Sequence, residues 1–215
     1  FRSYHHGELT FSMIYAYSED FILTLSHDEV VHGKASMIGK MPGNRESQFA
    51  NLRVAYGFMA ANPGKKLLFM GQDFGQYDVW SEEKGVEWEL LEYPEHQQMH
   101  RYYKDLNDFY TSHPAMYQLD YNPDGFEWIN SINANENTVS FVRKTRKKEE
   151  MLLIICNFAP ITWEKKKIGV PYPGKYKEIF NSDRKEYGGT GVVNARVKQS
   201  RKDEADDRPD SITIN

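Results

Sequence analysis

Apolar residues in the first half of the chain form two short runs, at residues 21–25 and 67–70, and polar residues follow each run directly. Between the runs, Phe49, Leu52 and Tyr56 recur at the spacing of a buried helix face. The second run is continuous rather than alternating, which is typical of a strand buried on both faces of a parallel sheet. The pattern therefore predicts a strand, a helix and a second strand.

The ends of the helices carry their own signals. Asn44 is a suitable N-cap, and the Asn-Pro-Gly sequence at residues 62–64 ends the first helix because proline cannot continue it. A second helix is expected from about residue 96 to residue 112, where His-Pro follows. A strand, a loop and a helix that occur twice in succession are typical of two units of a β/α barrel.

The second half of the chain has a different pattern. Short β-prone runs alternate with clusters of Asn, Asp, Gly and Pro, which indicates an antiparallel β domain, most simply a β-sandwich. The segment 183–209 is polar and highly charged, and we expect it to be a mobile surface loop. The expected strands lie at residues 126–129, 139–142, 151–157, 176–180 and 211–215.

Composition narrows the class of protein. The formal net charge of −4 argues against a nucleic-acid partner. No apolar run approaches the roughly 20 residues that span a bilayer, so no membrane contact is expected. The single cysteine, Cys156, excludes an internal disulfide framework and is typical of a reducing compartment, here the cytoplasm. It lies in an apolar run, which favours a buried structural thiol over a nucleophile.

Chemistry-bearing side chains follow both runs of the first half. His27, Asp28 and Glu29 come after the first, and Asp73 comes after the second. In α/β enzymes, ligands meet the carboxyl ends of the strands, so these four residues are candidates for catalysis or substrate binding. The alternative is that His27 and Asp28 cap a turn and that Asp73 is a hydrogen-bonding loop acid.

Two tryptophans lie in the long loop after residue 74. An exposed ring of Trp80 or Trp88 could stack on the face of a sugar, so both are candidate substrate-binding residues. Simple packing is an equally good interpretation of each ring, and the sequence leaves the choice open.

Several other kinds of site are disfavoured by spacing. His27 and His32 are five residues apart, whereas the zinc-protease motif needs two histidines four apart on a helix. Ser26, His27 and Asp28 are chain neighbours and cannot adopt the relay geometry of a serine triad, and no Gly-X-Ser-X-Gly elbow occurs. These spacings therefore disfavour a zinc site and a serine triad at this turn.

Four blocks of the sequence resemble bacterial glycogen branching enzymes of the α-amylase superfamily. They agree in order and approximate spacing over essentially the whole chain, and members of that family form α-1,6 branches in α-1,4-glucan. The blocks are LSHDEVVHGK at residues 25–34, FANLR at 49–53, PGKKLLFMG at 63–71 and DGFEW at 124–128.

The resemblance implies a fold and an origin for the chain. Residues 1–113 would be the last portion of a catalytic (β/α)8 barrel, and residues 114–215 an incomplete antiparallel β-sandwich. The family's aspartate nucleophile and glutamate acid/base lie on earlier barrel strands, and no segment of this chain matches their motifs. We therefore expect a truncated piece that lacks the N-terminal part of its own barrel and is inactive alone.

The resemblance also implies roles at the end of the first strand. Asp28 would be the third catalytic carboxylate, which stabilises the transition state, and His27 would donate a hydrogen bond to the same glucose unit. The implied partner is an α-1,4-glucan such as glycogen or amylose. No metal and no organic cofactor are implied, because acid-base glycosyl transfer needs only carboxylates. Two alternatives stay open: a hydrolytic relative within the same superfamily, and a fragment that binds glucan without catalysis.

Overall fold

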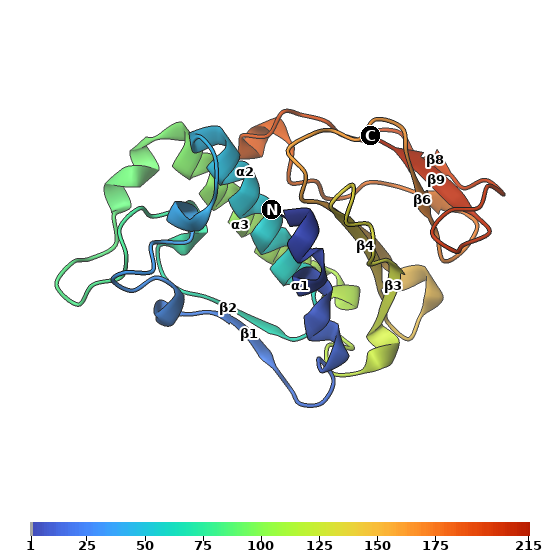
Figure 1. Cartoon of the computed structure of the whole chain (residues 1–215), viewed down its shortest axis with the longest axis horizontal. Coiled ribbons are helices and arrows are strands. Elements are labelled where there is room, and N and C mark those ends of the chain that lie inside the picture. Colours follow the sequence, from blue (N-terminus) through green and yellow to red (C-terminus); the bar gives the residue numbers. More distant parts are fainter. Residues whose placement is uncertain (1) are drawn as a thin grey trace.

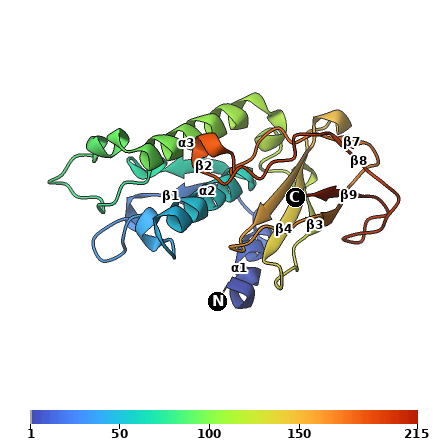
Figure 2. The ribbon, with the colours of Figure 1, turned by 90° about the horizontal axis from the view of Figure 1, so that it is seen from above.

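The computed structural model describes residues 2–215. A part with three α-helices and a two-stranded sheet comes first, and a part built of β-strands, loops and short 3-10 turns follows it (Figure 1). Strands β1 (Ile22–Leu25) and β2 (Lys65–Leu68) pair in parallel, with Ile22 opposite Lys65 and Leu25 opposite Leu68. Helices α2 (Arg45–Ala61) and α3 (Pro94–Ser112) run side by side over one face of this sheet (Figures 1 and 2).

The predicted strand–helix–strand order is confirmed, but the second strand differs in position and burial. It occupies Lys65–Leu68 rather than residues 67–70, and burial on both faces is wrong. Leu67 is 41% exposed and Met70 is 53% exposed. The sheet has two strands and helices on one face, so alternate residues of each strand point away from the helices.

The ends of the two long helices follow from local chemistry. The Asn44 side chain accepts a hydrogen bond from the Ser47 backbone N–H at 3.0 Å, as its N-cap position predicts. Pro94 opens α3 at the first turn, where a missing N–H costs nothing. The buried face of α3 contains Met99, Tyr102 and Leu106, so these side chains at helical spacing belong to the core.

A short helix that the sequence pattern did not predict lies against the β part. This helix, α1 (His6–Thr10), follows a 3-10 turn at Arg2–His5. Arg2 donates to the Phe158 carbonyl at 2.6 Å, and the His6 Nε2 lies 3.1 Å from the Ser131 carbonyl. The start of the described chain is thereby tied to the β part.

All strand pairs of the β part are antiparallel. Three strands form one sheet in the order β3–β4–β5, while β6 pairs with β9 and β7 pairs with β8. Figure 2 shows these strands beyond the ends of α2 and α3. Their bounds are β3 (Phe126–Asn130), β4 (Thr138–Arg143), β5 (Leu152–Asn157), β6 (Lys166–Gly169), β7 (Lys175–Tyr176), β8 (Lys198–Gln199) and β9 (Ser211–Ile214).

The two larger sheets pack around a small cluster of their own. Ile129 and Val142 of the three-stranded sheet meet Ile168 and Ile212 of the β6–β9 pair, all buried. The strand expected at residues 176–180 is reduced to two residues, and β6 and β8 were not predicted because their lysine-rich sequences carry little apolar signal.

The expectation of a mobile loop at residues 183–209 is wrong for much of that segment. Tyr187 is only 3% exposed, and its hydroxyl donates to Asp105 of α3 at 2.8 Å. Arg53 of α2 donates to the Tyr187 carbonyl at 3.0 Å, and β8 lies farther along. One aromatic anchor and one buried guanidinium fix a segment whose average composition is polar.

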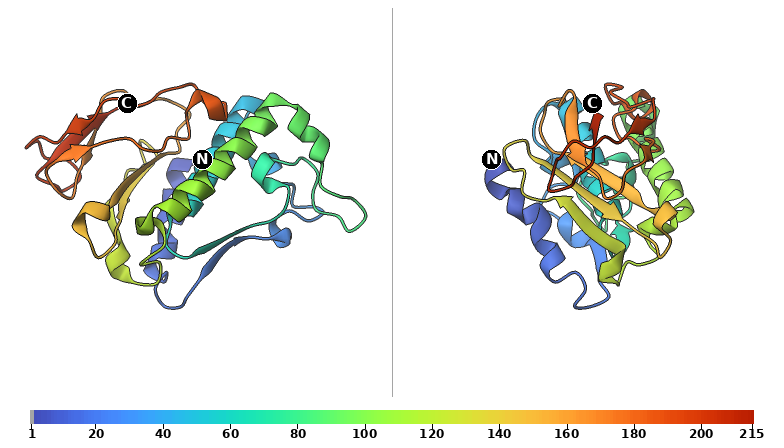
Figure 3. Two further views of the ribbon diagram at one scale, coloured as in Figure 1. Left: turned by 180° about the vertical axis from the view of Figure 1, so that it is seen from behind. Right: turned by 90° about the vertical axis from the view of Figure 1, so that its right-hand side faces the viewer.

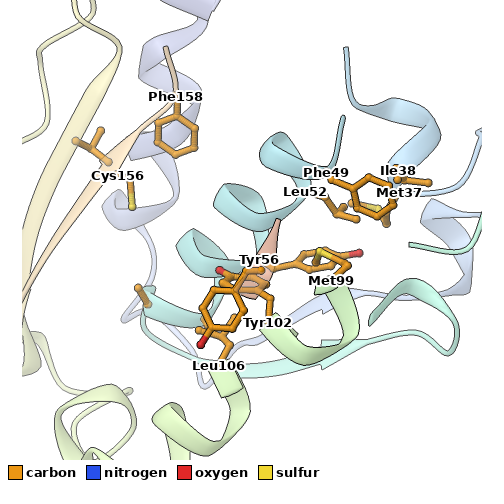
Figure 4. Packing of buried hydrophobic residues seen from close by; sticks show 14 of the residues in the cluster. Met37, Ile38, Phe49, Leu52, Tyr56, Met99, Tyr102, Leu106, Cys156 and Phe158 are labelled. Atoms are coloured by element: carbon orange, nitrogen blue, oxygen red, sulfur yellow. The ribbon is translucent and has the colours of Figure 1, made fainter. Parts of the chain in front are cut away.

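One hydrophobic core continues from the helices into the β part (Figure 4). Leu52, Tyr56 and Tyr102 are fully buried in it, and Phe158 and Cys156 reach it from the other side. Burial raises the pKa of the Cys156 thiol to about 12, so the thiol is protonated at neutral pH. The prediction of a buried structural cysteine is confirmed.

A buried ion pair joins the same two parts. The Arg143 side chain is 0% exposed; it donates to the Asp120 carboxylate at 2.6 Å and to the Ala61 carbonyl at 2.6 Å. The other Asp120 oxygen lies 3.0 Å from Lys65 Nζ. This network fixes β4 to the end of α2 and the start of β2.

Within residues 2–215, no helix is both long and apolar enough to cross a bilayer.

We predict that Asp120→Ala strongly destabilises the chain, because it leaves the Arg143 guanidinium buried without its counter-ion. The expected loss is about 3–5 kcal/mol of unfolding free energy, measured by urea denaturation. Asp203→Ala is the matched control, since Asp203 pairs with Lys167 at 2.9 Å on the surface. An exposed pair is worth roughly 0–1 kcal/mol, so equal losses in the two variants would refute a special role for the buried pair.

Candidate functional site

A tight turn at the carboxyl end of β1 presents the candidate residues. The 3-10 turn His27–Glu29 is closed by a capping box: the Ser26 backbone N–H donates to Glu29 Oε2 at 2.7 Å, and Ser26 Oγ accepts from the Asp28 N–H at 3.3 Å. The Ser26 hydroxyl also lies 3.1 Å from Glu29 Oε2. The backbone that carries His27 and Asp28 is therefore locally fixed.

Glu29 faces this turn and holds it. Partial desolvation alone would raise the pKa of the Glu29 carboxyl, but hydrogen bonds from the Ser26 hydroxyl and backbone N–H outweigh it and lower that pKa. The carboxylate form is therefore favoured by the turn itself. This engagement gives Glu29 a structural task, and its proposed contact with substrate stays a prediction.

His27 and Asp28 point outward from the same turn. Their side chains are 49% and 70% exposed, and His27 Nε2 lies 3.3 Å from Asp28 Oδ1. A carboxylate with this exposure keeps oxygens free to accept hydrogen bonds from hydroxyl groups. The structure thus brings the two predicted residues together, at the edge where a ligand of a parallel sheet is expected.

The His27 ring lies against two aromatic side chains. Its centroid is 5.5 Å from Trp80, in an edge-to-face arrangement, and 6.1 Å from Phe69. The Trp80 backbone N–H donates to the Val30 carbonyl at 2.8 Å. Trp80 is half-buried, so it packs beside the turn rather than standing free in solvent. Sequence reasoning missed Phe69, because nothing in a strand-end apolar run marks one ring as lining a site.

Asp73 and Trp88 form a second group farther along. Asp73 Oδ2 lies 3.5 Å from His100 Nε2, and the Phe74 ring lies between His100 and Trp88, with centroids 6.4 Å and 5.8 Å away. Trp88 is 65% exposed, so its outer face is open to solvent. His100 was not singled out from the sequence, since a histidine on a later helix carries no signal of this contact.

A groove of about 410 Å³ runs beside this second group. Phe69 and Asp73 line it from the β2 side, and His100 and Lys104 line it from α3. Phe69 therefore contributes to both the groove and the surroundings of His27. Among residues 2–215, no group of three or more His, Cys, Asp and Glu side chains is arranged to hold a metal ion, and His27 and His32 form no such group.

Comparison with known proteins gives a family-model match over part of the chain and longer matches to two individual enzymes. Residues 128–215 match the family model of the alpha amylase C-terminal all-beta domain. The chain is 51% identical over 193 residues to a 1,4-alpha-glucan branching enzyme of Oceanobacillus iheyensis, covering 90% of this chain and 30% of that enzyme. It is 49% identical over 202 residues to the corresponding enzyme of Aquifex aeolicus, covering 94% and 32%. The chain thus spans about a third of the length of these relatives.

Solved structures agree at the level of the fold. A cyclomaltodextrinase aligns with a TM-score of 0.54 at 12% identity, over 90% of this chain and 27% of that one. An alpha-amylase from H. orenii aligns with a TM-score of 0.51 at 19% identity, over 90% and 37%. The helical part followed by an all-β part is therefore an arrangement found in amylase-family proteins.

We predict that neighbouring acids in the turn differ in their effect on stability. Glu29→Ala removes the capping box and should cost about 1 kcal/mol of unfolding free energy, measured in urea at neutral pH. Asp28→Ala should change it by less than about 0.5 kcal/mol, because the side chain is exposed.

The pH dependence has a fixed sign. A lowered pKa stabilises the fold above the unfolded-state pKa of Glu29, and this contribution is lost as the pH falls through the folded-state pKa. The Glu29→Ala deficit should therefore shrink in acid. A larger loss from Asp28→Ala than from Glu29→Ala would contradict the division of tasks.

Proposed function

Because this chain corresponds to a C-terminal portion of the 1,4-alpha-glucan branching enzymes, 51% and 49% identical to two of them, we propose that it supplies part of a glucan-branching site. The parent protein would cleave an α-1,4-glucan and transfer the freed chain to a 6-hydroxyl, which creates an α-1,6 branch. The sequence match carries the proposal. The exposed His27–Asp28 pair at the carboxyl end of β1 supports it independently.

We propose that β1, α2, β2 and α3 are the last two units of a (β/α)8 barrel, and that residues 114–215 are most of a β-sandwich. β1 and β2 pair in parallel and are connected by α2, which supports the first assignment. So does the sheet face that the helices leave open, where Ile22 is 57% exposed and Leu67 is 41% exposed. The two antiparallel sheets packed around Ile129 and Ile212 support the second.

The reaction would proceed by retaining double displacement. That chemistry uses a nucleophilic carboxylate and an acid/base carboxyl about 5 Å apart. A covalent glycosyl-enzyme forms first, and the acid/base group then activates the acceptor hydroxyl. Sequence motifs for these two groups do not occur among the 215 residues, so we propose that other segments of the parent enzyme provide them.

Asp28 would act as the third carboxylate. Its exposed oxygens can accept hydrogen bonds from the ring hydroxyls of the glucose unit at the cleaved bond. If these bonds tighten as the ring flattens towards an oxocarbenium ion, they stabilise the transition state more than the bound substrate, which is the requirement for catalysis. His27 would donate to the same sugar, with its ring held against Trp80 and Phe69.

The remaining candidates would extend the contact surface. Trp88, with its open face, is the best placed ring for stacking on a sugar. Asp73 lines a groove whose volume of about 410 Å³ lies within the usual range for ligand pockets. Trp80 would shape the wall beside His27, and Glu29 would hold the turn. Glucan binding without catalysis is the second candidate function for the chain itself, favoured by the exposure of Trp88.

We predict that Asp28→Ala in the full-length enzyme abolishes most branching while leaving the fold intact. Loss of one group that stabilises the transition state costs about 10²–10³ in kcat, and new α-1,6 linkages on amylose provide the assay. The melting temperature serves as the control for folding. Retention of more than half the activity would rule out the proposed role of Asp28.

We also predict that the 215-residue chain alone forms no branches. Its own carboxylates would hold a sugar without making or breaking a glycosidic bond. Incubation with amylose followed by debranching and chain-length analysis checks this point. Detection of new α-1,6 linkages would show that a nucleophile and an acid/base group are present in the chain after all.

A further inference from the structure

We propose that Glu87 is a positioning residue of the branching site: its carboxylate closes the loop 77–87 and thereby sets Trp80 against His27. This inference rests on the proposed function. It concerns a residue that neither touches the expected substrate position nor stands out in the sequence, where it is one acid among several in the loop. Figure 3 shows the loop projecting beyond the helices between β2 and α3.

The closure of the loop is a two-donor clamp. Glu87 Oε2 accepts hydrogen bonds from the backbone N–H groups of Tyr77 and Asp78, each at 2.8 Å. The Glu87 backbone N–H donates to Gln76 Oε1 at 3.1 Å. Both the side chain and the backbone of Glu87 therefore hold the end of the loop to its beginning. Hydrogen bonds to a charged acceptor are about twice as strong as neutral ones, which makes the carboxylate the main fastening.

The base of the loop is held by the two long helices. The Arg45 guanidinium of α2 lies 3.9 Å from the centre of the Tyr77 ring, and the Tyr77 hydroxyl lies 2.9 Å from His96 Nε2 of α3. Gln76 is 5% exposed, and its backbone N–H donates to the Gly71 carbonyl at 3.0 Å. Glu87 therefore fastens the far end of the loop to a fixed point.

The fastened loop meets the turn at Trp80. Its N–H donates to the carbonyl of Val30, which directly follows the His27–Glu29 turn, and its ring edge contacts the His27 ring at 5.5 Å. The path from Glu87 to His27 thus consists of the Tyr77 and Asp78 amides, the short segment to Trp80 and one ring contact. Release of the clamp leaves two N–H groups without their acceptor and lets Trp80 move away from His27.

The kinetic test uses the full-length enzyme that contains this sequence. Glu87→Ala should lower kcat/KM for branching by about 10–100-fold, since a displacement near 1 Å can have that effect. Glu87→Gln should retain most activity, because its amide oxygen still accepts hydrogen bonds. Glu83→Ala, an exposed acid of the same loop, is the matched control and should match the wild type.

A spectroscopic test reports on position rather than stability. In the same enzyme, the ring-proton resonances of His27, assigned by their loss in His27→Gln, carry the ring-current shift of Trp80. Trp80→Leu removes that shift. Glu87→Ala should move the His27 resonances in the same direction, whereas Glu87→Gln and Glu83→Ala should leave them in place.

The outcomes separate the two proposals. A wild-type enzyme without branching activity overturns the proposed function, and the His27 resonances then still test the clamp. A branching wild type with unmoved His27 resonances in Glu87→Ala overturns the positioning role. If Glu87→Ala fails to fold, Glu87→Asp decides: its shorter side chain draws the carboxylate away from the Tyr77 and Asp78 N–H groups, so His27 resonances unmoved from the wild type overturn the positioning role.

Discussion

The packing of α2 against both the two-stranded sheet and the β part is the constraint on which the rest of the structure depends. Leu52 and Tyr56 of this helix are fully buried in a core that also receives Phe141 from the β part. At its end, the Ala61 carbonyl accepts from the buried Arg143, whose partner Asp120 reaches Lys65 at the start of β2. The helix thereby fixes the two-stranded sheet relative to the β-strands, and the sheet in turn fixes the edge that carries His27 and Asp28.

At that edge, neighbouring residues of one turn have different tasks: one fixes the backbone and another presents a free carboxylate. Glu29 turns back to accept from Ser26 and keeps the backbone in place, while Asp28 keeps an open carboxylate. A group that holds a distorting sugar needs both properties, because a mobile carboxylate would lose its advantage in the transition state. The Trp80 contact and the Glu87 clamp act in the same way on His27, since they restrain its ring and leave it partly exposed.

Sequence patterns predicted the parts of this fold that depend on local chemistry. The Asn44 cap and the helix end at residues 62–64 follow from short-range hydrogen bonding and backbone restriction, and both are confirmed. Tertiary contacts escaped prediction. Leu67 looked buried on both faces, yet its exposure depends on what covers the sheet. The segment around Tyr187 looked loose, because the Arg53 and Asp105 contacts that hold it come from distant helices.

His27 and Asp28 were found from their place after a strand. His100 and Glu87 were missed because their contacts are set by folding alone.

A crystal structure of the full-length enzyme with a bound α-1,4-linked oligosaccharide tests the central claim most directly. The account predicts that the Asp28 carboxylate accepts hydrogen bonds from two hydroxyls of one glucose unit, at about 2.5–3.0 Å, and that His27 donates to the same unit. It also predicts that the catalytic nucleophile, from another segment of the enzyme, contacts the same glucose unit. A sugar bound with Asp28 facing solvent, away from every hydroxyl, would contradict the assignment of this edge as the glucan site.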